Sequence, residues 1–307
     1  MLIALLCIGA VLLDYQWGEP RHWHPLVGFG GLAQRVEALA YGTPELSVKV
    51  RRERGIGAVI VLLTPFTVAV WLLAKIPLIG PVMALGLLYM AIGTRSLTQH
   101  AEAVAAALRV GDLPLARQKV AMIVSRDTDD LNEEEISRAT AESVLENGCD
   151  ATFGVLFWFV LAGTAGVVLY RLTNTLDALW GYRTPRYLHF GWAAARLDDA
   201  LNWLPARLTA LSYALAGRQL VLAWRCWQEQ APGWKSPNAG PVIAAGAGAL
   251  GLALGGPARY RGEWQSRSAL GEGLAPRAED IGRAVALVRR ALWLWLAVIL
   301  LGGLVLA

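Results

Sequence analysis

The stretch IGAVIVLLTPFTVAVWLLA, residues 56–74, decides the fold, because no charged side chain interrupts it. About 20 apolar residues make a helix long enough to cross a bilayer, where backbone polar groups must be paired within the chain. The basic tract RRER, residues 51–54, precedes it by one residue, Gly55. Basic residues of this kind flank spanning helices on the cytoplasmic side. The stretch therefore predicts a transmembrane helix that begins in the cytoplasm.

The composition of the whole chain agrees with this prediction. Of its 307 residues, 55% are hydrophobic and 13 are Trp, and the mean hydropathy is +0.43. Such values lie outside the usual range of soluble domains. We therefore expect an all-α polytopic membrane protein with about six spans and cytoplasmic helical loops, forming a single integral membrane domain over residues 1–307. The candidate spans are 1–13, 56–74, 78–93, 153–170, 208–224, 241–255 and 291–307.

The charges indicate which segments face the cytoplasm. The net charge is +4, but the basic residues flank apolar segments rather than form a stripe with aromatic residues, so no nucleic-acid partner is expected. A polar helical insertion at 94–152 and polar motif loops at 171–207 and 256–290 carry many of these charges. All three segments lie on the same side of the membrane only if the segment 153–170 is re-entrant or buried between other helices. We favour that arrangement, which leaves six spans.

The polar insertion at 94–152 has the pattern of three helices. Apolar residues recur at helical spacing from Leu97 to Leu108, and Gly111 followed by Asp112 indicates a helix end and a new N-cap. Asn132 and Glu135 have the spacing of a capping box, which predicts a further helix to about residue 147.

Two features of this insertion suit anions and metal ions. Ser125, Arg126, Asp127 and Thr128 offer hydroxyls, a guanidinium and a carboxylate within four residues, a set that suits phosphate and Mg²⁺. On the following helix, one face carries Arg138, Glu142, Glu146 and Asp150. The alternative interpretations are a surface turn and a solvated stripe of ion pairs.

A second polar region follows the apolar segment 153–170. Its densest part holds Asn174, Asp177, Tyr182 and Arg183, and a short helix after it carries Arg196, Asp198 and Asn202. Asp198 and Asn202 are one helical turn apart. The alternatives are anchoring at the membrane boundary and a structural salt bridge between Arg196 and Asp199.

Three further patterns do not predict a function. His22 and His24 have no third ligand nearby in sequence, so we expect no metal site there. The GxGxxG run at 246–251 lies in an apolar stretch without strand–helix alternation and overlaps a GxxxG pair, which favours close helix packing. Cys7, Cys149 and Cys226 form no CxxC pair, which favours ordinary packing.

Several of these stretches together resemble adenosylcobinamide-phosphate synthase, the CbiB-type family of cobamide biosynthesis. The resembling stretches are LDYQWGEPRHWHPLVGFG at 13–30, SRDTDDLNEEEI at 125–136, AESVLENGCD at 141–150, the block from NTLD to PARLTA at 174–210, SPNAG at 236–240, LGG at 254–256 and LGEG at 270–273. The block at 174–210 is the closest match. There are two departures. Glu19 stands where the family usually has Asp, and Pro241, Val242 and Ile243 stand where Trp-Pro-Glu is expected, which removes a carboxylate.

The resemblance implies an ATP- and Mg²⁺-dependent acid–amine ligase. It would join adenosylcobyric acid, a corrinoid, to an aminopropanol phosphate in a multi-pass protein of the bacterial inner membrane. The implied partners are these two substrates, the lipid bilayer and other membrane enzymes of cobamide assembly. Catalytic candidates are Asp127, Glu142, Glu146 and Asp177, and Mg²⁺ candidates are Asp127, Glu146 and Asp150. Substrate-binding candidates are Ser125, Arg126, Thr128, Asn147, Asn174, Tyr182, Arg183, Arg196, Asp198, Asn202, Arg207, Ser236 and Asn238.

Two other functions stay open at this point. The same resemblance extends more weakly to membrane sensors related to β-lactamase induction, which bind without catalysing. Polar groups near the membrane also suit a transporter. The complete NTLD, GYR and RLDD set favours the enzyme, and charges inside the spans, which a transporter would need, are missing from the sequence.

Overall fold

The computed structural model describes residues 1–19, 24–43 and 46–306. The chain forms two compact units, which are described separately. Unit 1 comprises 1–93, 154–202 and 306–307, and unit 2 comprises 94–153 and 203–305. The single membrane domain expected from the sequence stays a prediction.

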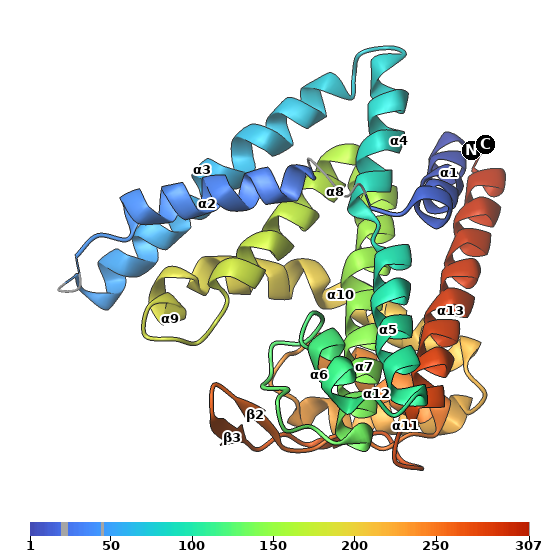
Figure 1. Ribbon diagram of the computed structural model, residues 1–307. Helices are drawn as coiled ribbons and strands as arrows, with labels where there is room; N and C mark the ends of the chain where they lie inside the picture. The colour runs from blue at the N-terminus through green and yellow to red at the C-terminus, as the bar shows by residue number, and fades with distance from the viewer. Residues whose placement is uncertain (20–23, 44–45, 307) are drawn as a thin grey trace. The chain divides into compact units, whose positions relative to one another are not determined.

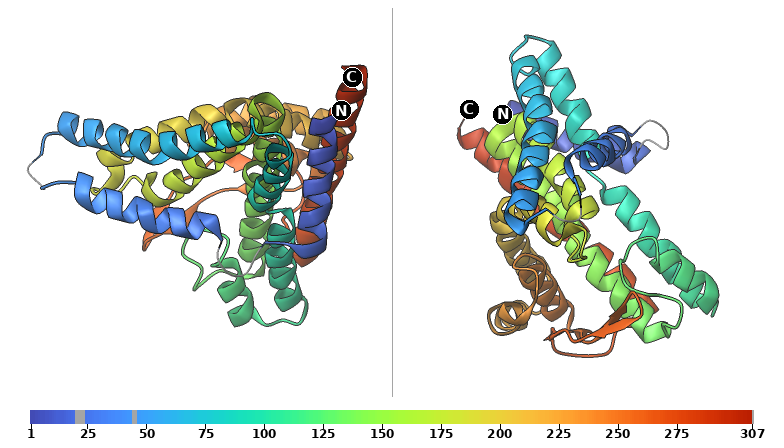
Figure 2. Two further views of the ribbon diagram at one scale, coloured as in Figure 1. Left: turned by 90° about the horizontal axis from the view of Figure 1, so that it is seen from above. Right: turned by 90° about the vertical axis from the view of Figure 1, so that its left-hand side faces the viewer.

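Among its described residues, unit 1 contains helices and no strands. They are α1 (Leu2–Trp17), α2 (Pro25–Ala40), α3 (Val48–Leu73), α4 (Ile79–Ala91), α8 (Gly154–Trp180), α9 (Tyr187–Phe190) and the first part of α10 (Trp192–Ala216). Helix α2 packs on α3, and α1 packs on α4 (Figures 1 and 2). Large apolar side chains of α2, α3, α8 and α9, with Trp180 and Phe190 at their centre, form the core.

Unit 2 is organised around α7 (Glu133–Gly148), which is buried along most of its length. Helices α5 (Thr94–Arg109), α6 (Leu113–Val120), α12 (Ala239–Leu250) and α13 (Ala278–Val305) pack against or beside it (Figure 1). The remaining helices are the π-helix η1 (Cys149–Phe153), the second part of α10, α11 (Leu220–Gln230) and the 3-10 turn η2 (Ala231–Gly233). Small residues on α7, among them Ala139, Thr140 and Ala141, allow this close approach.

Four short strands lie between α12 and α13. Strand β1 (Leu254–Gly255) pairs antiparallel with β4 (Ala269–Leu270). Strand β2 (Ala258–Tyr260) pairs antiparallel with β3 (Glu263–Gln265), and Arg259 is opposite Trp264. These strands form a small ribbon on an otherwise helical protein.

The structure confirms the fold class as an all-α polytopic membrane protein. Within the described residues, four helical segments are long and apolar enough to cross a bilayer: Val48–Leu73, Ile79–Arg109, Glu133–Trp180 and Ala278–Val305. Two further apolar helices, Leu2–Trp17 and Ala239–Leu250, are shorter. The three helices predicted for 94–152 are present, and both parts of the Asn132–Glu135 capping box are formed.

Two of the candidate spans are wrong. The segment 208–224 is divided between α10 and α11, because α10 ends at Ala216. The next residue, Gly217, packs closely on Ala249 of α12. The segment 241–255 is mostly α12, which is about 18 Å long at 1.5 Å per residue, too short to span. All 12 residues of α12 are buried in the protein. Its apolar sequence reflects contact with neighbouring helices rather than with lipid.

Gly246 and Gly248 of α12 serve close helix packing, as expected from the sequence, but the GxxxG pair Gly251 and Gly255 does not lie on one helix, because Gly251 ends α12 and Gly255 belongs to β1. A Cβ atom on Gly248 would lie 2.7 Å from the Ala223 Cα atom of α11, and one on Gly246 would lie 2.6 Å from the Leu145 side chain of α7. Gly251 ends the helix in the left-handed conformation, with φ 66° and ψ 42°. These residues form a helix end rather than a turn between a strand and a helix.

The polar tracts 171–207 and 256–290 are not loops throughout. The first is mainly helical, within α8, α9 and α10, and the second contains three strands before α13 begins at Ala278. Many of their polar residues therefore lie on helices and strands, whereas others, such as Tyr182 and Arg261, lie in turns.

The segment 153–170 folds back on itself. Gly163 has φ 60° and ψ −151°, a conformation that interrupts α8. A Cβ atom on Gly154 would overlap the Tyr170 hydroxyl group, and one on Gly166 would lie 2.5 Å from the Trp158 carbonyl oxygen. In a straight helix, residues 154 and 170 would be about 24 Å apart along the axis. The segment therefore forms two arms joined at Gly163, as the re-entrant interpretation expects.

We predict that Gly166→Ala destabilises the protein by about 1–3 kcal/mol, because the new methyl group meets a backbone carbonyl that cannot move aside easily. Gly86→Ala on α4 is the matched control, since nothing lies within 4 Å of its Cβ position. Thermal unfolding of both variants in detergent measures the difference. Equal melting temperatures for the two variants would show that the arms of α8 do not pack closely.

Candidate functional site

The predicted loop at 125–128 is bound to the β2–β3 hairpin through Asp127. One carboxylate oxygen of Asp127 accepts the Arg261 N–H at 2.9 Å, and the other accepts the Gly262 N–H at 2.7 Å. The Arg259 guanidinium is 3.3 Å away. The Gly262 hydrogen bond is the largest cause of a lowered pKa for Asp127, with Arg261 and Arg259 adding to it. Asp127 therefore stays ionised and holds the hairpin turn.

Glu142 on α7 is the centre of a buried group of charges. It is 2% exposed, forms an ion pair with Arg126 and accepts hydrogen bonds from the Arg267 guanidinium at 3.1 and 3.3 Å. The Gly255 N–H donates to the Glu142 Oε1 atom at 2.8 Å, and Arg126 pairs with Oε2. Both carboxylate oxygens are thus used inside the protein. This arrangement favours a structural role over the predicted catalytic one.

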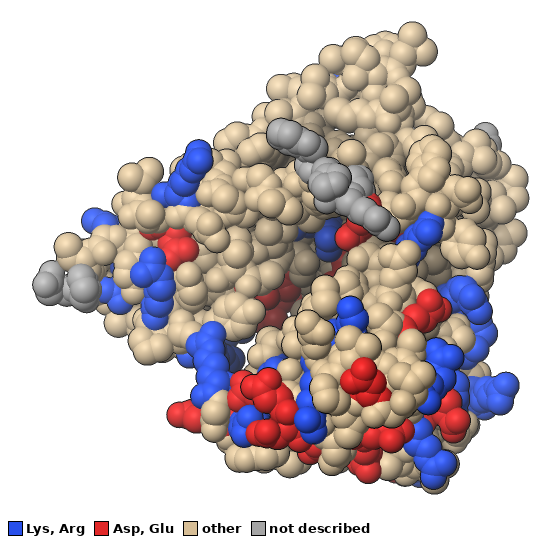
Figure 3. All heavy atoms as spheres, viewed as in Figure 1, with Lys and Arg blue, Asp and Glu red and all other residues tan. Residues whose placement is uncertain are grey.

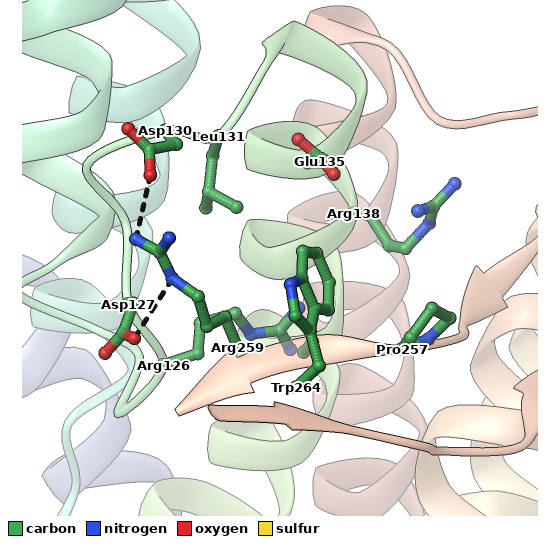
Figure 4. A pocket seen from close by; sticks show the side chains of 10 residues that line it. Arg126, Asp127, Asp130, Leu131, Glu135, Arg138, Pro257, Arg259 and Trp264 are labelled. Atoms are coloured by element: carbon green, nitrogen blue, oxygen red, sulfur yellow. Dashed lines mark ion pairs between the residues drawn. The ribbon is translucent and has the colours of Figure 1, made fainter. Parts of the chain in front are cut away.

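A groove of unit 2 lies beside these residues (Figure 4). Its lining comes from the 126–131 loop, α7 and the β2–β3 hairpin, and comprises Arg126, Asp127, Asp130, Leu131, Glu135, Arg138, Pro257, Ala258, Arg259 and Trp264. Arg259 pairs with Asp130 at 2.8 Å, and the Trp264 ring is 66% exposed. Charges of both signs are intermixed on the face of unit 2 drawn in Figure 3. An exposed indole beside guanidinium and carboxylate groups can bind a nucleotide with its metal ion.

The predicted Mg²⁺ ligands do not form a joint site. Within 1–19, 24–43 and 46–306, no three His, Cys, Asp or Glu side chains are grouped closely enough to hold a metal ion. Asp127 is committed to the hairpin, and Glu146 and Asp150 lie toward the other end of α7 and in η1, with contacts of their own. The helical spacing explains this. It places four residues on one face but spreads them along the length of the helix: Arg138, Glu142, Glu146 and Asp150.

Other predicted residues of the insertion have local roles. Ser125 is exposed, while Thr128 is 7% exposed and its carbonyl accepts the Leu131 N–H. The Asn147 amide donates to the Ser143 carbonyl at 2.9 Å, one turn earlier on α7. Arg138 pairs with Glu134 on the same helix.

The structure brings together Arg207, Ser236 and Asn238 of unit 2. The Arg207 guanidinium donates to the Asn238 side chain at 3.0 Å and to the Pro237 carbonyl at 3.1 Å. The Ser236 hydroxyl accepts the Ala239 N–H at 3.1 Å, so it fixes the turn that leads into α12. Desolvation by burial lowers the pKa of Arg207. The SPNAG segment is therefore a fixed turn against α10.

In unit 1, the structure brings together Asn174, Asp198 and Asn202. The Asn202 amide donates to Asp198 at 3.0 Å, and the Asn174 amide lies 3.4 Å from its other oxygen. The Tyr170 hydroxyl donates to Asn202 at 2.7 Å. Arg171 joins this cluster, because its guanidinium lies 3.4 Å from the Asn174 side-chain oxygen.

The environment of Asp198 changes its acidity. Burial raises the pKa of Asp198 to about 6, although hydrogen bonds from Asn202 and Asn174 lower it. A carboxylate that titrates near neutral pH is suited to accept and release a proton. The cluster thus combines two side-chain amides, which recognise polar groups, with a carboxylate that can accept a proton.

The other predicted residues of 171–207 lie on α8, on α10 and in the segment after α8. Asp177 lies within the last turn of α8, one turn after Asn174, so it does not cap a following helix. Tyr182 is 44% exposed in the turn after α8. Burial raises the pKa of Asp199, and the nearby Arg196 and Arg183 oppose this shift. Arg196 pairs with Asp199 at 3.4 Å, the structural salt bridge that the sequence offered as the alternative.

Several charged contacts of the structure have no signal in the sequence. Glu37 of α2 is 5% exposed and binds Arg186, the Trp180 indole at 3.1 Å and the Tyr187 hydroxyl at 3.3 Å. In the sequence, Arg259 and Arg267 are only two of the basic residues of the 256–290 tract, and no pattern there singles out Trp264. His22 lies outside the described residues. Ile243, where the family pattern has Glu, is 1% exposed inside α12.

Comparisons with known proteins agree on one family. A family model described as CobD/Cbib protein matches residues 7–288. The cobalamin biosynthesis protein CobD of Chromobacterium violaceum is 60% identical over 290 residues, which cover 94% of this chain and 93% of that protein. The protein of the same name from Stutzerimonas stutzeri is 55% identical over 303 residues, 99% of each chain. No solved structure gives a significant match. From these matches along nearly its whole length, the chain belongs to the CobD/CbiB family of cobalamin biosynthesis proteins.

Proposed function

We propose that this protein forms the amide bond between adenosylcobyric acid and an aminopropanol phosphate, using ATP, in cobalamin biosynthesis. The observation that carries the proposal is the Asn174–Asp198–Asn202 cluster of unit 1. Asp198 is a partly buried carboxylate with a pKa of about 6, held between two side-chain amides. Amide formation needs a group that removes a proton from the substrate ammonium, and a corrinoid periphery offers amides for Asn side chains to bind.

The proposed reaction has two steps. The corrinoid carboxylate attacks the γ-phosphorus of ATP, which forms an acyl phosphate and releases ADP. The amine then attacks the acyl carbon, the new C–N bond forms and phosphate leaves with the C–O bond electrons. Asp198 accepts the proton that the ammonium loses before this attack. Positioned cations stabilise the charge that develops on the phosphates.

The groove of unit 2 is the proposed ATP site. Trp264 would stack on the adenine ring, and Arg138 and Arg259 would bind the phosphates, exchanging their carboxylate partners for phosphate oxygens. Mg²⁺ commonly binds one or two protein carboxylates together with substrate phosphates. Asp130 and Glu135 line the groove and fit that role. The Mg²⁺ supplies positive charge along the phosphate chain when it is bound.

The proposed location is the bacterial inner membrane, in several passes. The cytoplasmic side is the source of ATP, and the basic residues of 94–152 and 256–290 favour that side. The proposed partners are the two substrates, the bilayer and other membrane enzymes of cobamide assembly.

The experiment is an assay of the purified protein in detergent with adenosylcobyric acid, aminopropanol phosphate, ATP and Mg²⁺. We expect a corrinoid product heavier by the aminopropanol phosphate residue, with one ADP formed per product. Omission of ATP should abolish the product. An unchanged corrinoid in the complete mixture, with the protein folded, would contradict the proposal and favour a sensor.

We predict that Trp264→Ala raises the KM for ATP about tenfold, because stacking on an aromatic ring contributes about 1–3 kcal/mol per base. The KM values for both other substrates should stay unchanged. Trp224→Ala on α11 is the control, since this ring is 48% exposed and does not line the groove. Equal ATP affinity in both variants would exclude the groove as the adenine site.

A further inference from the structure

Helix α11 of unit 2 carries an exposed apolar cluster, the α11 patch, which consists of Leu220, Val221 and Trp224. These side chains are 48%, 82% and 48% exposed, and their spacing of one and four residues places them on one face of the helix. The opposite face packs on α12, and its residues Ala223 and Cys226 are buried. An exposed apolar cluster of this kind marks contact with a membrane or with another protein.

The residues before α11 place its start at the boundary of a spanning helix. The carbonyl of Ala216, the last residue of α10, accepts the Arg290 Nε–H of α13 at 2.9 Å. No charged residue follows Arg290 in α13, and this helix is long and apolar enough to cross a bilayer. Leu220 comes four residues after Ala216, a distance of at most about 14 Å. The first turn of α11 thus lies close to the level at which α13 leaves the bilayer.

The side chains around this boundary suit the layer between lipid and water. Trp293 of α13, three residues after Arg290, is 57% exposed, and Trp is enriched in that layer. Arg218 and Arg289 are exposed as well, and guanidinium groups near a bilayer attract negatively charged phospholipids. Leu215 adds an exposed apolar side chain at the end of α10. Apolar, aromatic and basic side chains in this combination are typical of an amphipathic helix at a membrane surface.

The second half of α11 limits how deeply the helix can enter the lipid. Gln228 and Glu229 are exposed there, and Arg225 pairs with Glu272 in the segment before α13. Charged and amide groups of this kind stay in water or among headgroups, because their transfer into hydrocarbon is costly. Only the first two turns of α11 are therefore suited to contact acyl chains.

We propose that the α11 patch is a membrane-binding surface and that its partner is the anionic phospholipid layer on the side of the membrane where Arg290 lies. The patch enters the upper part of the acyl chains, and Arg218 contacts the headgroup phosphates. This contact attaches unit 2 to the bilayer at a second place besides α13, and it does not depend on the proposed amide-forming reaction. It also explains why the segment 208–224 has the composition of a span although it does not form one.

The test uses the full-length protein in lipid nanodiscs, with a polarity-sensitive fluorophore attached to Val221→Cys. The native residues Cys7, Cys149 and Cys226 are buried, and the unsubstituted protein treated in the same way gives the background labelling. Val110→Cys is the matched control. Val110 is the same type of residue and is 78% exposed, but it follows the polar helix α5.

We expect the probe at position 221 to emit at shorter wavelength than the probe at position 110. Phospholipids that carry a nitroxide near the headgroup should quench it at least about twofold more strongly, because the patch lies among the upper acyl chains. Equal emission and equal quenching at the two positions would overturn the proposal. A shorter wavelength at 221 without lipid quenching, seen only in nanodiscs that hold two copies, would also overturn it, because a second copy would then cover the patch.

The charge of the lipid partner is tested with Arg218→Gln in the Val221→Cys protein. Replacing about one third of the phosphatidylcholine by phosphatidylglycerol should increase the lipid quenching at position 221. Arg218→Gln should reduce this increase by about half or more, because each basic residue near the surface adds to the attraction. Arg109→Gln, at an exposed position at the end of α5, should leave the increase unchanged. Quenching that does not respond to phosphatidylglycerol would contradict the proposed anionic partner.

Discussion

Replacing Glu142 with glutamine is expected to destabilise unit 2 by about 3–5 kcal/mol. The substitution leaves Arg126 and Arg267 buried without their shared carboxylate, and an uncompensated buried charge costs this much. The side chains of the two arginines are only 10% and 9% exposed, so water cannot replace the lost partner. Denaturant unfolding in detergent, followed by circular dichroism, measures the change.

The control for this prediction is Glu134→Gln on the same helix. Glu134 pairs with Arg138, but its side chain is 48% exposed, and pairs of this kind contribute about 0–1 kcal/mol. If Glu142→Gln unfolded at the same denaturant concentration as Glu134→Gln while losing activity, the buried charges would not stabilise the fold, and the predicted catalytic role of Glu142 would return.

The second large effect is expected for Asp198→Asn, which should lower the turnover of amide formation about 10²- to 10³-fold, or about 3–4 kcal/mol of transition-state stabilisation. Asparagine keeps the shape of the side chain but cannot accept the ammonium proton. Initial rates with saturating substrates measure the loss. Asp199→Asn, beside it in an exposed ion pair, is the control and should retain most activity.

Protonation of Asp198 is expected to change turnover and stability in opposite directions. Because its pKa is raised from 3.8 to about 6, turnover should fall below pH 6 as the carboxylate is protonated. The folded state binds this proton more tightly than the unfolded state, so the stabilisation is complete below pH 3.8 and is lost as pH rises through 6. Asp198→Asn should remove both dependences and add roughly 1–3 kcal/mol of stability at pH 8. If turnover of Asp198→Asn still fell below pH 6, the pH dependence would belong to another group.

Local signals in the sequence predict local structure well in this protein. The Asn132–Glu135 pair marks the start of α7 because capping depends on residues three positions apart. The contact between Asp198 and Asn202 follows from their spacing of one helical turn. Segment 56–74 forms part of α3 because its apolar character extends over the length of a span.

Contacts between distant segments could not be predicted in this way. Arg267 meets Glu142 from 125 residues away, and Arg186 meets Glu37 from 149 residues away. Periodicity along one helix contains no information on such partners. The same limit explains the error at 241–255, since an Ala- and Gly-rich helix has the same composition whether protein or lipid surrounds it. Only packing against α7 and α11 separates the two cases.

The attachment of Asp127 to the hairpin has a consequence for local opening. Strands β2 and β3 have three residues each, and an isolated ribbon of this length is not stable in water. The hairpin turn depends on a carboxylate about 135 residues earlier in the chain. Neither segment can therefore separate from the protein alone without breaking the same hydrogen bonds. Amide hydrogen exchange at Arg261 and Gly262 and at the 125–131 loop should follow one shared rate, and protease cleavage in one segment should expose the other.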